Sequence, residues 1–585
     1  MITSKEKRIH CADVCVVGGG LAGLSAAVSA ARHGASVVLM QDRPVLGGNA
    51  SSEIRMWVRG AHGLENRETG IIQELELENI YRNPSMNYSI WDSVLYQAVR
   101  EEKNIVLLLN CSCLGCEMRE DRIASVTGWQ LNSYLYHEVR AKIFLDCSGD
   151  SILAPLSGAG FRTGREARRE FGEYAAGESA DRHTMGSSCL IEARKTDHPC
   201  AFTPPDWAYV YPDDESMYLK NHDIAGTGVN FWWIELGGEQ DTILDAQEIH
   251  EELIRVAFGV WDHIKNRGDH GMENWELEWI GFLPGKRESR RYEGAYMLNQ
   301  RDLEEGTRFA DAVAFGGWTM DNHDPKGFRF MGYSSRHIQT KAPYQIPFRC
   351  LYSRNIANLM FAGRNISASH MALSSTRVMG TCAVIGQAAG TGAALAVRHG
   401  CLPADVADGY IRELQQALLE DGCFIPGMNR QSTGRVSARL SAGENAILQD
   451  GWERPHDGCG HAVAFPEGGE LTVDLLAPCK RLRLALDPDF SRQSISSIER
   501  YQRFAMRTHV NGPEEEVHMP AHLLRSCAVA AVAPDGREIA GWQICENRRP
   551  RLYLDIPEGA SQIRLRSMRS WGGEGVRIFS CDAAR

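Results

Sequence analysis

Three glycines near the N-terminus have the residue type and spacing of a phosphate-binding turn. Gly18, Gly20 and Gly23 form the pattern Gly-x-Gly-x-x-Gly between an apolar run at residues 14–17 and a small-residue segment at residues 21–33. Glycine permits the tight turn and lets backbone N–H groups and a helix N-terminus approach a pyrophosphate. Because the pattern follows a predicted strand and opens a predicted helix, it indicates dinucleotide binding rather than a turn used only for packing.

The residue at the end of the second predicted strand normally accepts hydrogen bonds from the ribose hydroxyls of a dinucleotide, and it is usually acidic. The strand at residues 37–40 is followed here by Gln41, with Asp42 next in the chain. Gln41 can still accept one hydrogen bond, and a small shift would bring Asp42 to the same place. Both residues are therefore candidates for ribose recognition.

Arginines gather in and beside the polar motifs of the chain. Arginine can hold a carboxylate through two hydrogen bonds, or stabilise negative charge that develops in a reaction. The catalytic candidates of this kind are Arg59 and Arg364, and the substrate-binding candidates are Arg55, Trp57, Arg287, Arg290 and Arg291. Since Arg287 and Arg290 stand three residues apart, as do Glu288 and Arg291, an internal ion-pair network is an equal alternative for that group.

Histidine titrates near neutral pH and suits proton transfer. His370 stands six residues after Arg364 and is the first candidate for a general acid or base, followed by His62 and His323. The chain has 19 histidines, and each one taken alone is more often structural or exposed. A structural role therefore remains the alternative for all three.

Among 17 cysteines there is one tight group, Cys111-x-Cys113-x-x-Cys116. Such a group can hold zinc or a cluster, but no further cysteine or histidine lies nearby with ligand spacing. The remaining cysteines are scattered through apolar surroundings, which is typical of buried reduced thiols. We expect no metal site in this chain.

The elements that would position these residues begin with a strand, a helix and a strand at residues 14–17, 21–33 and 37–40. A connection of that length joins parallel strands, so the pattern predicts an α/β, doubly wound, Rossmann-like sheet. Further strands are expected at residues 105–109 and 141–146, with a hairpin or small meander across residues 114–130. Helices are expected at residues 68–81 and 89–102.

The later parts of the chain differ in composition and in hydrophobic periodicity. Residues 164–344 are aromatic-rich and irregular, with a helical pattern at residues 245–265, and indicate an inserted α+β cap. A strand at residues 358–363 and a small-residue helix at residues 381–399 return to the first sheet, and short alternating segments beyond residue 427 predict an antiparallel β-sandwich. The predicted domains are the first part of a dinucleotide-binding domain at 1–163, an inserted cap or substrate domain at 164–344, the return segment of the first domain at 345–426 and an accessory sandwich at 427–585.

Composition narrows the class of protein. The chain has 585 residues, a net charge of −12 and 43% hydrophobic residues, which is ordinary for a globular protein of several packed units. An acidic chain without a basic patch argues against nucleic acid as a partner. Because we find neither a signal-peptide pattern nor a membrane-spanning window, we expect a cytoplasmic protein without a membrane partner.

Several motifs, taken together, resemble the bacterial FAD-dependent oxidoreductase family of the two-dinucleotide-binding-domain flavoprotein superfamily. They are Gly47-Gly-Asn-Ala-Ser-Ser-Glu53, Phe144-Leu-Asp-Cys-Ser-Gly-Asp150, Pro284-Gly-Lys-Arg-Glu-Ser-Arg-Arg291, Ala362-Gly-Arg-Asn365, Ser374-Ser-Thr-Arg-Val-Met-Gly380 and Gly386-Gln-Ala-Ala-Gly390. The similarity covers roughly the first 425 residues, and the order of the motifs is more specific than any one of them. The family is related in fold to fumarate reductase flavoproteins.

The resemblance implies FAD as the cofactor. It also implies that a helix beginning near Gly386 and Gln387 lies at the isoalloxazine, where its N-terminus would place partial positive charge. The alternative is a tightly packed helix with no flavin contact. The expected cofactor contacts are Gly18, Gly20, Leu21, Ala22, Gly23, Gln41, Asp42, Arg43, Gly47, Gly48, Asn49, Ala50, Ser51, Ser112, Cys113, Ser148, Gly149, Asp150, Gly363, Arg364, Arg377, Gly380, Thr381, Gly386, Gln387 and Ala388.

The leading hypothesis is an FAD-dependent oxidoreductase that transfers a hydride between flavin N5 and a polar small molecule, either a sugar derivative or a carboxylated compound. The electron partner and the oligomeric state are left open by the sequence. A flavin-binding protein with a structural or non-redox role is the alternative. An NAD-dependent enzyme is disfavoured because Gly47-Gly48 and the later glycine motifs are typical of FAD-linked proteins.

Overall fold

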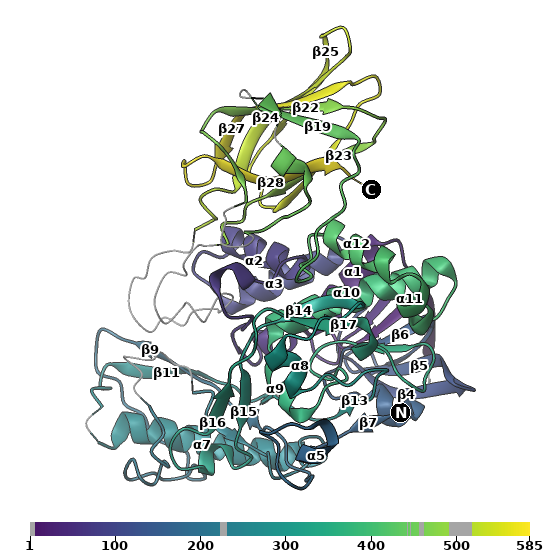
Figure 1. Ribbon diagram of the computed structural model, residues 1–585. Coiled ribbons are helices and arrows are strands. Elements are labelled where there is room, and N and C mark those ends of the chain that lie inside the picture. The colour runs from purple at the N-terminus through teal and green to yellow at the C-terminus, as the bar shows by residue number, and fades with distance from the viewer. Residues whose placement is uncertain are drawn as a thin grey trace. The chain divides into compact units, whose positions relative to one another are not determined.

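The computed structural model describes residues 6–222, 231–268, 270–440, 443–444, 446–455, 461–490 and 518–584. The chain divides into two compact units, shown in Figure 1. The first unit is built mainly from Met1–His62 and Ser85–Ile411, and the second from Gly63–Pro84, Arg412–Ser494 and Glu516–Arg585. The four-domain division of the sequence analysis stays a prediction.

A mixed sheet forms the centre of the first unit. Its strand order is β3-β2-β1-β6-β5-β4, and β18 also pairs with β6. Strands β1, β2, β3, β6 and β18 pair in parallel, whereas β4, β5 and β6 are antiparallel. Their bounds are β1 Lys7–Val17, β2 Val37–Met40, β3 Ile105–Leu108, β4 Cys111–Arg119, β5 Arg122–Gln130, β6 Leu135–Asp146 and β18 Leu359–Phe361. The predicted α/β class with parallel strands at the N-terminus is confirmed.

Two helices made of small residues pack against each other beside this sheet. They are α1, Leu21–Arg32, and α10, Met379–His399. A Cβ added at Gly386 would lie 2.1 Å from the carbonyl oxygen of Ala22, and one at Gly390 would lie 2.2 Å from that of Ala26. The backbones of the two helices therefore touch, and only glycine fits at these two positions of α10.

Helix α10 is also the one described helix that is long and apolar enough to cross a membrane, judged by length and composition alone. Of its most apolar window, 94% is buried inside the protein. The same property identifies a core helix of a globular protein, and its contacts with α1 explain its composition.

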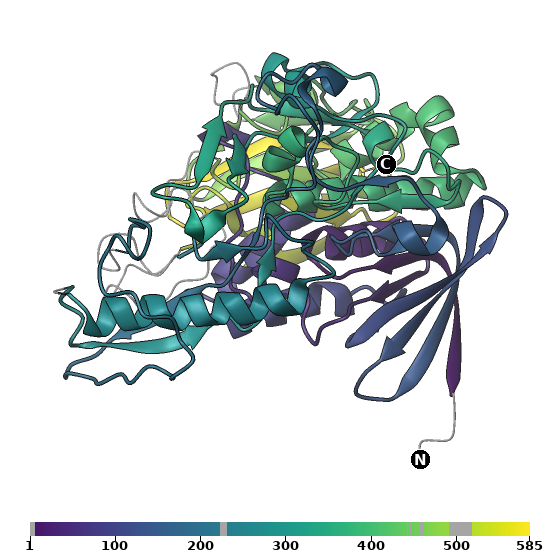
Figure 2. The same cartoon turned by 90° about the horizontal axis from the view of Figure 1, so that it is seen from below.

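A separate hydrophobic core lies in the inserted region, around α7, Ala246–Asn266. Side chains of α7 pack with those of the strand pair β9, Ile191–Lys195, and β11, Trp275–Ile280. Figure 2 shows the long teal helix with strands extending along it. The predicted helix at residues 245–265 is confirmed, since its apolar positions face this core.

A short hairpin of the inserted region carries several polar side chains. Strand β15, Met320–His323, pairs with β16, Ser335–Ile338, so that Asp321 lies opposite His337 and His323 lies opposite Ser335. Because side chains alternate along a strand, Asp321 and His323 point to one face of the hairpin, and Asn322 points to the other.

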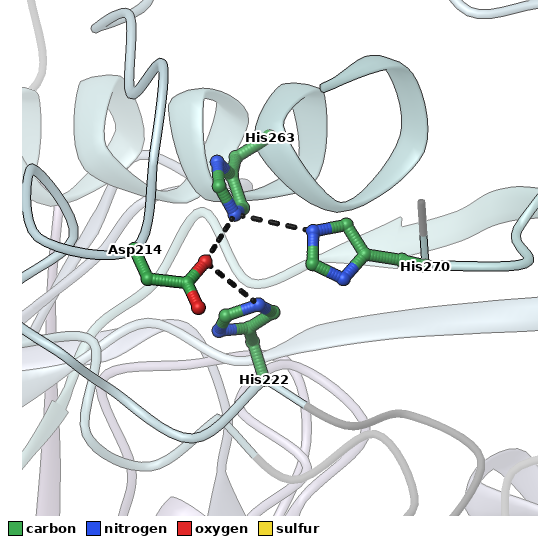
Figure 3. Close-up of side chains that lie close together, drawn as sticks. All are labelled: Asp214, His222, His263 and His270. Atoms are coloured by element: carbon green, nitrogen blue, oxygen red, sulfur yellow. Dashed lines mark hydrogen bonds and ion pairs between the residues drawn. The ribbon is translucent and has the colours of Figure 1, made fainter. Parts of the chain in front are cut away.

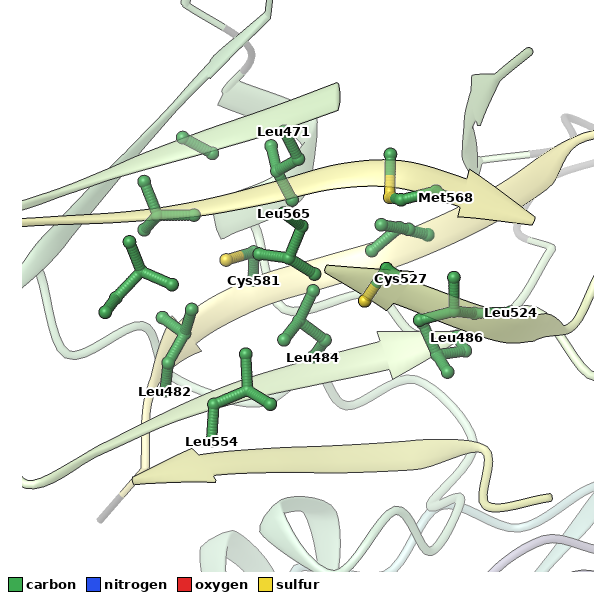
Figure 4. Packing of buried hydrophobic residues seen from close by; sticks show 14 of the residues in the cluster. Leu471, Leu482, Leu484, Leu486, Leu524, Cys527, Leu554, Leu565, Met568 and Cys581 are labelled. Atoms are coloured by element: carbon green, nitrogen blue, oxygen red, sulfur yellow. The ribbon is translucent and has the colours of Figure 1, made fainter. Parts of the chain in front are cut away.

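The second unit contains two antiparallel sheets. The first has the order β20-β19-β22-β27-β24-β25 and the second has the order β21-β28-β23-β26. Leucines from both, such as Leu471 and Leu565 of the first and Leu482 and Leu484 of the second, meet in one buried cluster (Figure 4). The bounds are β19 Val436–Leu440, β20 Gly443–Glu444, β21 Val463–Phe465, β22 Gly469–Leu475, β23 Arg481–Leu486, β24 Leu524–Val532, β25 Glu538–Ile544, β26 Arg551–Asp555, β27 Gln562–Ser570 and β28 Val576–Ala583.

Helix α2, Ile71–Arg82, belongs to this second unit although its residues lie early in the chain. Its Leu77 is part of the buried cluster, and its Glu78 pairs with Arg548 at 2.9 Å. The helix itself was predicted at residues 68–81, but its place among the C-terminal strands was not. The other predicted helix of this region is present as α3, Tyr88–Arg100.

Candidate functional site

A cavity of about 1090 Å³ in the first unit collects most of the predicted site residues. Its walls come from the ends of β1 and β2, from the segments after β6 and β18, and from the inserted region. The predicted cofactor residues that line it are Gly18, Gly20, Leu21, Ala22, Gln41, Asp42, Arg43, Gly47, Gly48, Asn49, Ser112, Cys113, Ser148, Gly149, Asp150, Gly363, Arg364 and Arg377. Crevices at the carboxyl ends of parallel strands are where α/β proteins bind ligands.

The first glycine turn leaves open space in front of the N-terminus of α1. A Cβ at Gly23 would lie 1.8 Å from the carbonyl oxygen of Gly18, so Gly23 serves the packing of the turn and does not line the cavity. At Gly20, by contrast, an added Cβ would meet nothing closer than the Cα of Gly48, at 3.9 Å. Gly20 caps α1 without a side-chain hydrogen bond, and the first turn of α1 has no acidic residue. The N–H groups there suit an anion such as a pyrophosphate.

Gln41 is buried, and its amide holds the glycine turn together. Its Oε1 accepts the N–H of Gly19 at 2.6 Å, and its Nε2 donates to the carbonyl oxygen of Val45 at 3.1 Å. Its neighbour Asp42 has a side chain that is 61% exposed. Asp42 is therefore the residue with a carboxylate available beside the cavity at this strand end.

The second glycine turn lies against the first. Gly47 forms a bridge with Gly20, and its φ of +103° is strained for residues with a side chain. Ala50 and Ser51 do not line the cavity, because the Ser51 hydroxyl donates to the carbonyl oxygen of Gly48 and the carbonyl of Ala50 accepts from Trp91. These two predicted contacts support the turn from behind.

Asp150 connects the segment after β6 with two cations of the cavity wall. Its carboxylate pairs with Arg364 and with Lys286, each at 2.7 Å. Burial alone would raise the pKa of Asp150, but the charges of Arg364 and Lys286 outweigh it and lower the pKa to about 2. Asp150 therefore fixes both cations in place as a carboxylate.

The start of α10, and not its middle, reaches the cavity. Val378, Met379 and Cys382 line it, and the N-terminus of α10 has no side-chain cap. The expectation that a helix begins near Gly386 is wrong, because Gly386 lies about two turns into the helix and packs on α1. The other predicted contacts of this helix, Gly380, Thr381, Gln387 and Ala388, are likewise buried and do not line the cavity.

A chain of charged groups runs along the wall that the inserted region contributes. Glu235 is fully buried, and its carboxylate contacts His323 Nδ1 at 2.6 Å and Arg287 Nη1 at 3.4 Å. The other ring nitrogen of His323, Nε2, lies 3.2 Å from Asp321, which also contacts Arg377 at 3.3 Å. Burial alone would raise the pKa of Asp321, but the charges of His323 and Arg377 hold it well below its usual range.

Two residues of this wall, Tyr333 and His337, were missed by the sequence analysis. His337 lies opposite Asp321 in the hairpin, with 3.6 Å between its Nε2 and the carboxylate, and the Tyr333 hydroxyl lies 3.0 Å from the same nitrogen. A polar alternation on two short strands was the only local signal, and it becomes informative only when the register is known.

Aromatic rings form another part of the wall. His62 stacks on Trp318 with ring centroids 4.4 Å apart, and Arg59 lies over Trp57 and Trp318 at 5.2 and 5.5 Å. Buried donors without a partner among the described residues include Trp57 Nε1, Trp318 Nε1, Arg364 Nε and Arg377 Nε. All four belong to side chains that line the cavity. Since buried donors are normally satisfied, a polar ligand fits here.

His370 lies away from the cavity, which contradicts its role as first candidate for proton transfer there. Its ring nitrogens contact Glu288 at 2.9 Å and Asn322 at 2.9 Å. Asn322 points to the face of β15 opposite to Asp321 and His323, so the hairpin stands between His370 and the cavity. His62 and His323, the other two candidates, both line the cavity.

The predicted substrate-binding arginines divide in the same way. Arg287 and Trp57 line the cavity, whereas Arg55, Arg290 and Arg291 do not. Arg291 is fully buried between Glu166, at 2.8 Å, and Glu288, at 3.4 Å. For Arg291 the internal ion-pair network, which the spacing had left as an alternative, is the observed arrangement. Arg55 contacts Glu192 at 2.5 Å, and Arg290 lies over the ring of Phe161.

The buried position of Glu235 predicts a loss of stability in acid. Burial alone would raise its pKa, but Arg287 and His323 outweigh burial and lower the pKa to about 2, from an ordinary 4.5. The native state is therefore stabilised above pH 4.5, by about 3 kcal/mol at most, and this stabilisation is lost as the pH falls towards 2. The thermal unfolding midpoints of wild type and Glu235→Gln, compared as a function of pH, measure the effect.

We expect wild type to be the more stable protein near neutral pH and the difference to shrink in acid, because glutamine cannot titrate. Glu305→Gln is the matched control, since Glu305 is 61% exposed and its ion pair is with Arg301, which is also exposed. Parallel pH profiles for wild type and Glu235→Gln would show that the acid sensitivity comes from other groups.

Comparison with known families gave a match over most of the chain. The model of a family described as FAD dependent oxidoreductase matches residues 13–418. No curated protein sequence matches significantly. Among solved structures, a geranylgeranyl bacteriochlorophyll reductase-like protein from Thermoplasma acidophilum is 14% identical, with 71% of this chain and 86% of that chain covered and a TM-score of 0.31.

Two further solved structures illustrate the range of similar proteins. FrdA of the E. coli quinol fumarate reductase is 11% identical, with 70% of this chain and 75% of that chain covered and a TM-score of 0.27. The glycerol-3-phosphate dehydrogenase from Bacillus halodurans, complexed with FAD, is 14% identical, with 33% of this chain and 43% of that chain covered and a TM-score of 0.21.

Proposed function

The chain belongs to the FAD dependent oxidoreductase family, and we propose that it transfers a hydride between the flavin and a polar small molecule, either a sugar derivative or a carboxylated compound. The cofactor is FAD and the activity is a flavin-dependent redox reaction. The observation that carries the proposal for the substrate is one cavity lined by both glycine turns and by His323, Asp321 and Arg377. The buried carboxylate of Glu235 contacts His323 and does not itself line the cavity.

The residues of the cavity fit FAD. The open space in front of Gly20, between two glycine turns and at the N-terminus of α1, suits the pyrophosphate. The carboxylate of Asp42 can accept hydrogen bonds from the ribose hydroxyls. The N-terminus of α10, beside Val378 and Met379, offers partial positive charge to the isoalloxazine. When bound, FAD supplies hydride transfer at its N5 atom.

The inserted region supplies the part of the wall that we assign to the substrate. Apart from Leu283 and Pro284, its side chains there are charged, hydrogen-bonding or aromatic, and they include Trp232, Arg287, Trp318, Asp321, His323, Tyr333 and His337. Aromatic faces pack against the C–H faces of a sugar, and arginines bind carboxylates. This mixture supports a substrate with several oxygen atoms and supports the inserted region as a substrate domain.

We assign the proton that accompanies hydride transfer to the histidines around Asp321. The carboxylate of Asp321 contacts His323 Nε2 and lies near His337 Nε2, so it orients both rings as a positioning residue. His337 is the more accessible ring, with a side chain that is 35% exposed, and its contact with the Tyr333 hydroxyl extends the hydrogen-bonded chain. Arg59 and Arg377 are placed to bind an anionic group of the substrate.

Anaerobic bleaching of the flavin tests the proposal. The purified yellow protein is mixed without oxygen with sugars and sugar acids, which can give a hydride to oxidised flavin, and the visible flavin band is recorded. Protein reduced beforehand with dithionite is mixed with keto-sugars and unsaturated acids, which can accept a hydride and restore the band. We expect bleaching or recovery of the band with an oxygen-rich substrate, and no bleaching with apolar alcohols of similar size. Bleaching by apolar compounds alone would contradict the substrate class, while FAD binding would stand.

Replacement of Arg59 separates carboxylated from neutral substrates. Loss of one charged hydrogen-bonding partner is expected to weaken the binding of a carboxylate by about 10-fold to 100-fold in Arg59→Gln. The dissociation constant is measured from the change in the flavin spectrum on adding the substrate or a non-reacting carboxylate analogue. A neutral sugar of the same size serves as the ligand control, and its affinity should change less than about 3-fold.

Arg336→Gln is the matched variant, because Arg336 lies on β16 on the face away from His337 and does not line the cavity. An equal loss of affinity for neutral and carboxylated ligands in Arg59→Gln would show that Arg59 shapes the cavity without binding an anion.

A further inference from the structure

Three histidines and one aspartate of the inserted region converge at a place separate from the cavity. They are Asp214, His222, His263 and His270 (Figure 3). One potential metal-ligand atom of each lies within 4.8 Å of those of the other three. None of these four described side chains lines the cavity of the flavin site.

The spacing of the four ligand atoms agrees with a common centre. His263 Nε2 lies 3.3 Å from Asp214 Oδ1 and 3.2 Å from His270 Nε2, and His222 Nε2 lies 3.6 Å from Asp214 Oδ1. A tetrahedral zinc ion with bonds of about 2.0–2.1 Å separates its ligand atoms by about 3.3–3.4 Å. The three measured separations bracket that value.

The hydrogen bonds behind the rings fix which nitrogen faces the centre. His263 Nδ1 lies 2.8 Å from the carbonyl oxygen of Tyr211, and His222 Nδ1 lies 2.8 Å from that of Lys220. A carbonyl oxygen only accepts, so in both rings Nδ1 carries the proton, and in the neutral ring Nε2 presents a lone pair. Metal-binding histidines usually have such a partner on the second nitrogen.

The same arrangement leaves acceptors facing one another. In the neutral rings the lone pairs of His222 and His263 point at a carboxylate of Asp214, which is itself acceptor-only. Protonated imidazoles would relieve the contacts to Asp214, but two protonated rings next to His270 would repel each other. A single divalent cation satisfies all four groups at once.

We propose that Asp214, His222, His263 and His270 bind one Zn²⁺ ion. Three imidazoles and one carboxylate suit zinc, and four protein ligands are typical of a structural site with no open position. His263 lies in the last turn of α7, whereas Asp214 and His222 belong to the segment at residues 196–222, which follows β9. The ion would join that segment to the end of α7.

Zinc content and zinc affinity of the FAD-loaded, full-length protein test the proposal. Any affinity tag is removed first, since histidine tags bind zinc. The zinc content is measured by plasma mass spectrometry after a chelator has removed the metal, and Zn²⁺ is then titrated back by calorimetry. We expect wild type to take up one Zn²⁺ per chain in this titration. In His222→Gln/His270→Gln we expect the affinity for Zn²⁺ to fall by about 100-fold or more.

The controls distinguish zinc bound at this site from zinc bound by any of the 17 cysteines, and loss of a ligand from loss of the fold. His198→Gln is matched, because His198 is an exposed histidine of the same region that contacts the neighbouring Asp197. It should bind zinc as wild type does, and FAD content checks that each variant folds. His270→Gln alone, in a segment outside α7, provides a milder variant should the double variant misfold.

Thermal unfolding gives a second readout that does not depend on activity. Removal of zinc should lower the unfolding midpoint of wild type and of His198→Gln, but not that of the His222→Gln/His270→Gln variant. Equal zinc affinity in wild type and the double or single histidine variants would overturn the proposal. The same follows if wild type takes up no zinc, which would identify the cluster as ion pairs of protonated histidines.

Discussion

Gly20→Leu is expected to fold and to bind FAD at least about 100-fold more weakly than wild type. Gly20 has φ −62° and ψ 177°, a conformation open to any residue, so leucine introduces no backbone strain. An added Cβ would meet nothing closer than Gly48 Cα at 3.9 Å. The leucine side chain would therefore fill the space in which the proposed pyrophosphate meets the N-terminus of α1.

Flavin content after purification and the dissociation constant of FAD for the apoprotein measure the effect, and far-ultraviolet circular dichroism checks the fold. Gly409→Leu is the matched control, since Gly409 is exposed at the end of α11, Pro403–Gly409, and an added Cβ there meets nothing within 4 Å. It should keep its flavin. A yellow Gly20→Leu protein with wild-type affinity would show that the pyrophosphate binds elsewhere.

Gly23→Ala is expected to differ from Gly20→Leu, because it should reduce the stability of the fold as well as flavin binding. The new Cβ would lie 1.8 Å from the carbonyl oxygen of Gly18, so the turn itself must move, and both stability and flavin binding should decrease. The contrast distinguishes a glycine required by packing from one required by the ligand, although both belong to the same sequence pattern.

The glycine turn could be predicted because its signals are local. A strand, three spaced glycines and a helix follow one another within residues 14–33, and the structure has β1 and α1 at these places. The start of α10 shows the limit of such signals. The small-residue pattern predicted a helix at residues 381–399, and α10 is Met379–His399, but the family resemblance implied a helix N-terminus near Gly386. The glycines at 386 and 390 are instead required by the contact with α1, which is distant in sequence.

Of the residues around Asp321, His323 and Arg377 were predicted as site residues, but His337 could not be predicted, because its contact depends on strand pairing. His337 reaches Asp321 only through the register of β15 and β16, and His370 is kept out of the cavity because Asn322 alternates with Asp321 along the same strand. A shift of register by one residue would exchange the two faces. Sequence proximity to Arg364 made His370 attractive, but the strand that separates it from the cavity comes from the inserted region.

The sequence gives no signal for the proposed zinc site. Its four members are spread over residues 214–270, and only His263 lies in an element with a periodic pattern. Residue types that can bind metals attract attention in a sequence when their spacing is short, as with the cysteines at 111, 113 and 116. In the structure Cys113 lies in the cavity wall, and burial raises the pKa of its thiol to about 12.

In the second unit, Glu453→Ala is expected to lower the free energy of unfolding by about 3–5 kcal/mol. Glu453 lies between two buried arginines, with Oε2 2.8 Å from Arg483 and Oε1 3.2 Å from Arg430. The side chains of Arg483 and Arg430 are 0% and 1% exposed. Burial alone would raise the pKa of Glu453, but these two charges lower it to about 2, so it is a carboxylate at neutral pH.

Urea denaturation of the full-length protein, followed by tryptophan fluorescence and circular dichroism, measures the effect. Glu538→Ala is the matched control, because its pair with Arg566 at 3.5 Å is on the surface, with side chains 51% and 37% exposed. It should cost about 1 kcal/mol or less. Equal shifts for the two variants would show that solvent reaches the Glu453 cluster.

A second substitution, Arg483→Met, tests why Glu453→Ala lowers the free energy of unfolding. Glu453→Ala removes the carboxylate and leaves the two guanidinium groups, among the described residues, with Asp582, Glu420, Ser580 and backbone acceptors. If the uncompensated charge causes the loss, Arg483→Met added to Glu453→Ala should recover part of the stability, although Arg483→Met alone destabilises. If the lost packing of Glu453 causes it, the second substitution should make the protein weaker still.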